Sequence, residues 1–143
     1  MVFRQICLLL SGSVLITAVA VAGSSRGESS ARQIKRGHYL VNAVAGCGDC
    51  HSPRLANGQP DGAHWLQGTT LFFAPVHPIP NWAKQSPNLA GLSSWKAEDV
   101  VKLLETGAFP DGRRPNPPMP SYHMNARDAQ AVVAYLKSLA GKP

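Results

Sequence analysis

The segment Cys47-Gly48-Asp49-Cys50-His51 decides how this sequence folds. Two thiols separated by two residues can reach two vinyl groups on one side of a porphyrin, and a histidine directly after the second thiol is presented to its iron. The spacing Cys-x-x-Cys-His is the attachment signature of c-type haem. It therefore predicts one covalently attached haem c, with Cys47 and Cys50 as attachment points and His51 as an axial ligand of the iron.

Two other uses of a cysteine pair fit the sequence less well. A thioredoxin-like redox pair would lie near a β-α-β pattern, which is not present here. A structural zinc site needs four ligands, usually as two pairs, and only one cysteine pair exists apart from Cys7. The remaining histidines show no paired ligand spacing, so a second metal site among them is not favoured; they are His38, His64, His77 and His123.

The sixth position of the iron requires a second ligand or stays open. Met119 lies in the segment Asn116-Pro117-Pro118-Met119-Pro120, where prolines restrict the backbone and stiffen the loop. Methionine with histidine is the ligand pair of electron-carrying cytochromes c, which favours Met119. Met124, His123, another histidine and an open site remain as alternatives.

The N-terminal segment has the pattern of an export signal. Arg4 precedes an apolar run from Ile6 to Ala22, which ends in Ala20-Val21-Ala22, a pattern typical of signal-peptide cleavage. We therefore predict a signal peptide at 1–22 and a periplasmic location. An uncleaved membrane anchor is the alternative, although the run is at the short end of what a bilayer requires.

Charge gives a weaker indication of partners. The full chain has a net charge of +6, and loss of 1–22 removes Arg4 and no acidic residue, which leaves +5. This charge could steer the protein toward an acidic partner. No dense basic run with interleaved aromatic residues is present, so nucleic acid is not an expected partner.

Periodicity predicts helices at both ends of the remaining chain and one between them. The small polar residues after Gly23 predict a flexible linker at 23–33. Helices are expected at 32–45, ended by Gly46, and at 95–106, capped by Ser94 and ended by Gly107. A third is expected after Asn125, which with Asp128 resembles a capping box, and it runs to about 139. The last helix has an apolar stripe, formed by Ala129, Val132, Val133, Leu136 and Leu139.

Long proline-rich loops connect these helices, and no strand is expected. Prolines interrupt 53–91 and 109–120, and so long a wrap in a small domain suggests that it encloses something. The segment 61–87 is unusual because it contains Trp65, Phe72, Phe73 and Trp82. We expect Trp65, Phe72 and Phe73 to cover the haem face or to line the core.

Several segments together resemble class I cytochromes c, and most closely the single-haem domains of bacterial dehydrogenase cytochrome subunits. They span 34–140 in the family order: Gly37-His38-Tyr39-Leu40, CGDCHSP at 47–53, Pro87-Asn88-Leu89, Trp95 with Glu98-Asp99, Leu104-Glu105-Thr106-Gly107, Pro117-Pro118-Met119-Pro120, and Asp128 with Ala134-Tyr135-Leu136. The resemblance implies an all-α cytochrome c domain of three to five helices wrapped around one haem. It also implies that the first and last helices cross near the haem edge, and that His51 and Met119 are the axial ligands.

These observations predict an electron-transfer protein rather than an enzyme. The expected partners are redox proteins, with a dehydrogenase as donor and an oxidase or another cytochrome as acceptor. The chain could be a free carrier or the cytochrome subunit of a periplasmic dehydrogenase complex. A haem enzyme or gas sensor would need a displaceable sixth ligand, which the stiff loop around Met119 disfavours.

Overall fold

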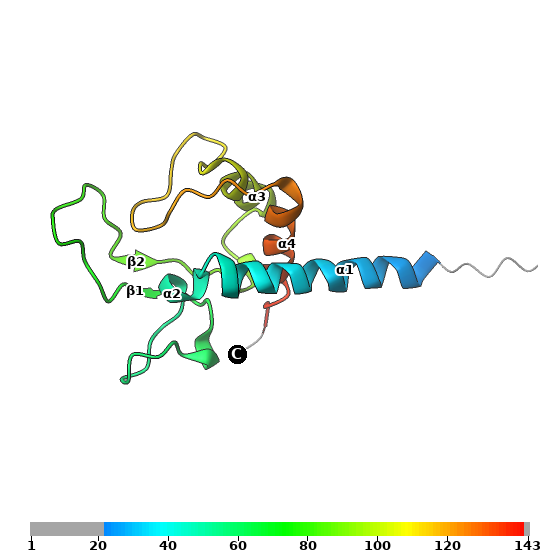
Figure 1. Cartoon of the computed structure of the whole chain (residues 1–143), viewed down its shortest axis with the longest axis horizontal. Coiled ribbons are helices and arrows are strands. Elements are labelled where there is room, and N and C mark those ends of the chain that lie inside the picture. Colours follow the sequence, from blue (N-terminus) through cyan, green and yellow to red (C-terminus); the bar gives the residue numbers. More distant parts are fainter. Residues whose placement is uncertain (1–21, 142–143) are drawn as a thin grey trace, which may run out of the picture.

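The computed structural model describes residues 22–141, and side chains from Ser29 onward. The helices α1, α3 and α4 pack together, the two-stranded sheet and its loop lie at one end of the molecule, and α1 projects far toward the other (Figure 1). The elements in chain order are α1 (Ala22–Tyr39), η1 (Leu40–Val44), α2 (Cys47–His51), η2 (Gly62–His64), β1 (Thr69–Thr70), β2 (Gln85–Ser86), η3 (Ala90–Leu92), α3 (Ala97–Thr106) and α4 (Ala126–Lys137).

The N-terminal helix is longer than expected. α1 begins at Ala22, so the segment 23–33 is helical, and the prediction of a linker there is wrong. The helix continues through the π-helical turn η1, and Gly46 ends it in the left-handed conformation, as predicted (φ 59°). The predicted signal peptide lies, except for its last residue, outside the described residues. Within 22–141, no helix combines the length and apolarity needed to cross a membrane.

The two C-terminal helices largely confirm the sequence pattern. In α4, the side chain of Asn125 accepts a hydrogen bond from the backbone N–H of Asp128, so the predicted cap forms (2.9 Å). α3 ends at Gly107, which has a φ of 72°. Its start was predicted wrongly, because Lys96 rather than Ser94 occupies the N-cap position and its side chain makes no capping bond.

The core lies where α1 and η1 pack against α4, with α3 on the other side of α4. α1 and α4 cross at Gly37, where an added Cβ would lie 1.9 Å from the carbonyl oxygen of Ala131. Only a residue without a side chain allows the two backbones to approach so closely. The expected crossing of the first and last helices is therefore present. The fully or nearly buried side chains include Leu40, Val41, Leu66, Leu92, Val100, Leu104, Ala129, Val132 and Leu136.

A short sheet organises the loop between α2 and α3. β1 and β2 are antiparallel, with Thr69 paired to Ser86 and Thr70 paired to Gln85. The bond from the Leu71 N–H to the Lys84 carbonyl continues this pairing (2.9 Å). The sequence analysis expected no strand, because two-residue strands carry no alternating pattern that a sequence could reveal.

Candidate haem site

The Cys-x-x-Cys-His segment forms α2, a single helical turn. Gly46 reverses the chain before it, and both Cys47 and Cys50 are free thiols on this turn. Gly48 is buried beneath Trp65, and an added Cβ would lie 2.0 Å from the indole ring. The residue between the thiols must therefore be small, and Trp65 fixes the position of the turn from one side.

Donors in the loop that follows α2 form hydrogen bonds to its backbone carbonyls. The hydroxyl of Ser86 donates to the Cys50 carbonyl, and the Gly68 N–H donates to the His51 carbonyl (2.7 Å). The guanidinium of Arg54 donates to the Asp49 carbonyl (3.2 Å). Because helix-terminal carbonyls lack intrahelical partners, these bonds stabilise so short a helix.

The imidazole of His51 has the tautomer that an iron ligand requires. Its Nδ1 lies 2.9 Å from the Pro87 carbonyl oxygen, which can only accept, so Nδ1 carries the proton. The lone pair is then on Nε2, and such an outer hydrogen bond orients a metal-binding histidine. Burial lowers the pKa of His51, while the bond to Pro87 acts in the opposite direction. Desolvation thus favours the neutral, ligating form of a side chain that is only 7% exposed.

Tyr122 lies close to both thiols. Burial raises the pKa of Cys47 to about 11, and burial followed by the nearby Asp49 raises the pKa of Cys50. The pKa of Tyr122 rises to about 12, through burial first and then through the proximity of both cysteines. Its hydroxyl donates to the Ala45 carbonyl (3.0 Å), which holds Tyr122 beside the start of α2.

The loop that carries Met119 is tied to the same frame. The Ala83 N–H donates to the Pro117 carbonyl (2.6 Å), and the Met119 N–H donates to the Asn116 carbonyl (3.2 Å). Met119 is half-buried. One short segment, 82–87, therefore contacts the Met119 loop through Ala83 and the His51 side through Pro87.

The alternative sixth ligands occupy other places. Met124 packs against the hydrophobic core, and its N–H donates to the Leu104 carbonyl (2.9 Å). A methionine in this setting fills core space. His123 is exposed. Ligation by Met119 stays a prediction.

Three buried donors without partners fit a large polar-edged cofactor. They are Nε1 of Trp82, Nε1 of Trp95 and Nε of Arg54. Buried N–H groups are rarely left unpaired in folded proteins. Haem c carries two carboxylates that accept hydrogen bonds, so the residues present are compatible with it. No group of three or more His, Cys, Asp or Glu side chains within 22–141 could hold a metal ion by itself.

The aromatic insert behaves only partly as expected. Trp65 packs against the core, as predicted. Phe72 and Phe73 do not line the core, because these side chains are 61% and 38% exposed, and the expectation that they cover the haem face stays a prediction. The ring of Phe73 contacts the rings of Phe72 and Trp82 edge-on.

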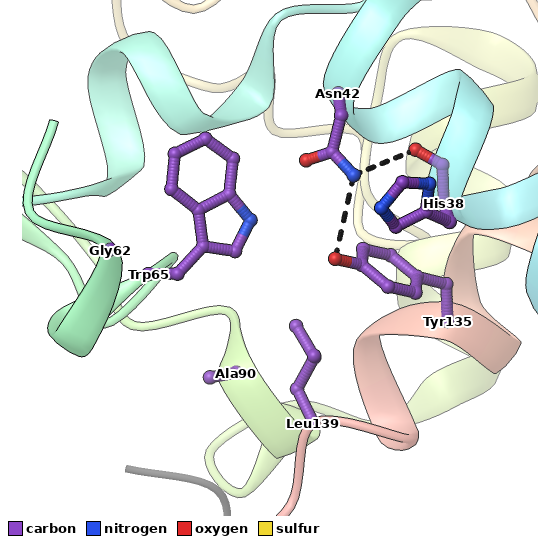
Figure 2. A pocket seen from close by; sticks show the side chains of 7 residues that line it. All are labelled: His38, Asn42, Gly62, Trp65, Ala90, Tyr135 and Leu139. Carbon is purple, nitrogen blue, oxygen red and sulfur yellow. Dashed lines mark hydrogen bonds between the residues drawn. The ribbon is translucent and has the colours of Figure 1, made fainter.

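A separate cavity of about 350 Å³ lies behind Trp65. Figure 2 shows Trp65 facing the side chains of Asn42, His38 and Tyr135 across it. The Asn42 amide donates to the His38 carbonyl (2.8 Å) and weakly to the Tyr135 hydroxyl (3.4 Å). Neither cysteine nor His51 lines this cavity, so it is not the candidate haem site.

Sequence reasoning did not identify three residues of the site: Tyr122, Ser86 and Pro87. Pro87 belongs to a segment that resembles the family, but that likeness gave it no role. Ser86 and Pro87 lie 36 residues after Cys50 and His51, respectively. Contacts over such separations leave no local pattern in a single sequence.

Comparison with known proteins agrees with this geometry. Residues 34–140 match the family model for cytochrome c. The cytochrome c subunit of a quinone alcohol dehydrogenase from Gluconobacter oxydans is 32% identical over 119 residues, which cover 78% of this chain and 25% of that protein. The cytochrome subunit of fructose dehydrogenase from Gluconobacter japonicus is 32% identical over 112 residues, or 75% of this chain and 22% of that subunit.

A diheme cytochrome c from Cereibacter sphaeroides is 31% identical over 72% of this chain and 34% of its own length. The chain thus spans about a quarter to a third of these three relatives. The family match covers most of the chain and includes the attachment turn, His51 and the loop of Met119. Membership implies covalent haem c with iron and a role in electron transfer. The chain belongs to the cytochrome c family, has the class I fold, and resembles the cytochrome subunits of bacterial dehydrogenases.

Proposed function

We propose that this chain is a periplasmic electron carrier with a single haem c, attached through Cys47 and Cys50 and ligated by His51 and Met119. The observation that carries the proposal is the hydrogen bond between Nδ1 of His51 and the Pro87 carbonyl, directly beside two free thiols. This bond leaves Nε2 unprotonated for a metal. One pair of closely spaced cysteines in the whole sequence supports a single haem.

When bound, haem c supplies an iron that gains or loses one electron. The chain positions and tunes that iron. His51 offers a neutral nitrogen, and the thioether of Met119 favours the less positive, reduced iron and hence a higher potential. Burial of the site acts in the same direction, because an apolar environment disfavours additional positive charge.

The partners that fit are other redox proteins. Relatives named as cytochrome subunits of alcohol, fructose and gluconate dehydrogenases support a dehydrogenase as the electron donor. An oxidase or a further cytochrome would accept the electron. The chain acts either as a free carrier or as a subunit of a dehydrogenase complex. The apolar run at 6–22 supports export.

An optical spectrum of the protein expressed in a periplasm tests the proposal directly. We expect sharp c-type bands on reduction, which carbon monoxide does not shift because both axial positions are filled. Shifted bands would indicate an accessible iron, and would favour sensing or catalysis. A colourless protein would contradict haem attachment altogether.

The Met119→Ala variant tests the sixth ligand, with Met124→Ala as the matched control. Met119→Ala should lower the reduction potential and allow carbon monoxide to bind the reduced protein. Met124→Ala should leave both properties unchanged while lowering stability by about 2–5 kcal/mol, as expected for a methionine packed in a core. The reverse result would assign ligation to Met124.

A further inference from the structure

Exposed apolar side chains are concentrated on one loop, which connects β1 to β2 and is called here the 71–84 loop. Of the seven large hydrophobic side chains that are exposed in the described part of the chain, four belong to it. Val76 is 94% exposed and Ile79 44% exposed, in addition to Phe72 and Phe73. Exposed apolar side chains that cluster in this way indicate a contact surface.

The segment that contains the loop has charge of one sign. From Trp65 to Leu89 the sequence contains no aspartate or glutamate, and Lys84 is its single lysine or arginine. An apolar tip with a lysine at its base is complementary to a layer that is apolar inside and anionic at its surface.

The loop also has the shape and stiffness for insertion. It forms the end of the molecule opposite the N-terminal end of α1 (Figure 1). Pro75, Pro78 and Pro80 restrict its backbone and lack N–H groups, which lowers the penalty for leaving water.

We propose that the 71–84 loop binds the surface of a membrane that contains anionic lipids, with Phe72, Val76 and Ile79 entering the interfacial layer. A lipid surface fits better than a protein partner, because the exposed side chains are apolar and the one charged residue of the loop is a lysine. The binding orients the molecule, since Ala83 and Pro87 connect the loop to both sides of the haem site. The proposal does not depend on the axial ligands or on the redox role.

Sedimentation with lipid vesicles tests this proposal. The haem-loaded protein is purified from the periplasm without detergent and mixed with vesicles of phosphatidylglycerol and phosphatidylethanolamine in equal parts. We expect it to sediment with them, and the double variant Phe72→Ser/Val76→Ser to bind at least about tenfold more weakly. Lys84→Gln should weaken binding about fivefold on these vesicles, and have no effect on phosphatidylcholine alone.

Val44→Ser is the matched control, because Val44 is also exposed (58%) but lies on η1, outside the loop. It should bind like the unaltered protein. An unchanged haem spectrum shows that each variant is folded. The proposal is overturned if the unaltered protein does not sediment with the vesicles, or if the double variant binds as well as Val44→Ser. A different result would identify a protein contact instead. The unaltered protein would then self-associate in the ultracentrifuge without binding lipid, and the double variant would not self-associate.

Discussion

The helical frame and the proline-rich loops of this molecule are held together in different ways. α1, η1, α3 and α4 are stabilised by buried apolar side chains and close backbone approach. The loops between α2 and α3, and between α3 and α4, contain few buried side chains and are held by hydrogen bonds within and between them and to α2. We infer that the frame determines stability and that the loops determine the surroundings of the iron.

The largest effect is expected from a change in the frame, Gly37→Val. The new side chain would overlap the Ala131 carbonyl, and α1 and α4 would have to separate. We expect unfolding to require about 3 kcal/mol less free energy, or the protein to fail to fold. Thermal denaturation measures this. Gly62→Ala is the control, because nothing lies within 4 Å of its added Cβ; equal losses in both variants would contradict the close crossing.

A change at the junction of the two regions should have an intermediate effect. In Gly48→Ala the new methyl group would collide with Trp65, whose ring must move toward the cavity behind it. We expect a loss of about 1–3 kcal/mol and a lower yield of haem-loaded protein. Absorbance and denaturation of the same sample measure both quantities. If Trp65→Phe combined with Gly48→Ala does not restore the yield, Trp65 is not the obstacle.

A change confined to the loops should alter the iron more than the fold. Ser86→Ala removes the hydroxyl that bonds the Cys50 carbonyl beside Pro87. We expect a loss of about 1 kcal/mol in stability, together with a shifted reduction potential. The reduction potential and the stability of this variant should be compared with those of Ser94→Ala, because Ser94 does not cap α3. A change in stability with no change in potential would remove the distinction between the two regions.

The smallest effect concerns an exposed ion pair within the frame. Arg36 binds Asp128 through Nε at 2.9 Å, and the hydrogen bond from Arg36 lowers the pKa of Asp128. A lowered carboxyl pKa contributes stability that is present above its ordinary value of 3.8 and is lost as the pH falls through the lowered value. Arg36→Gln should therefore be slightly less stable at neutral pH and equally stable at very low pH. For the control Lys35→Gln, the difference in stability from the unaltered protein should be the same at neutral and at very low pH.

Sequence alone predicted those parts of the molecule that depend on neighbouring residues. Gly46, Gly107 and the cap by Asn125 act within one helical turn, and each was located correctly. The attachment turn is likewise local. The start of α1 was missed because the polar segment 23–33 has no apolar stripe, and the β1–β2 pair was missed because its partners are far apart in sequence.

For the candidate site, too, the sequence indicates the residues of local motifs but not the contacts that folding brings together. Cys47, Cys50 and His51 were proposed from their spacing and Met119 from the prolines around it, and these assignments stay predictions. The outer contacts of His51 and Cys50 come from Pro87 and Ser86, which only the folded loop brings near. The exposure of Phe72 was also unpredictable, because aromatic residues in a sequence favour burial unless the loop that carries them projects into solvent.

The β1–β2 pair has a consequence for how this protein can vary. It closes the base of the 71–84 loop at Ser86, directly before Pro87, so the tip is separated from the bonds of Ser86 and Pro87 to α2. The tip can therefore be lengthened, shortened or exchanged as a cassette while His51 keeps its orientation. In this architecture, what the protein docks against can change while the outer contacts of Cys50 and His51 stay as they are.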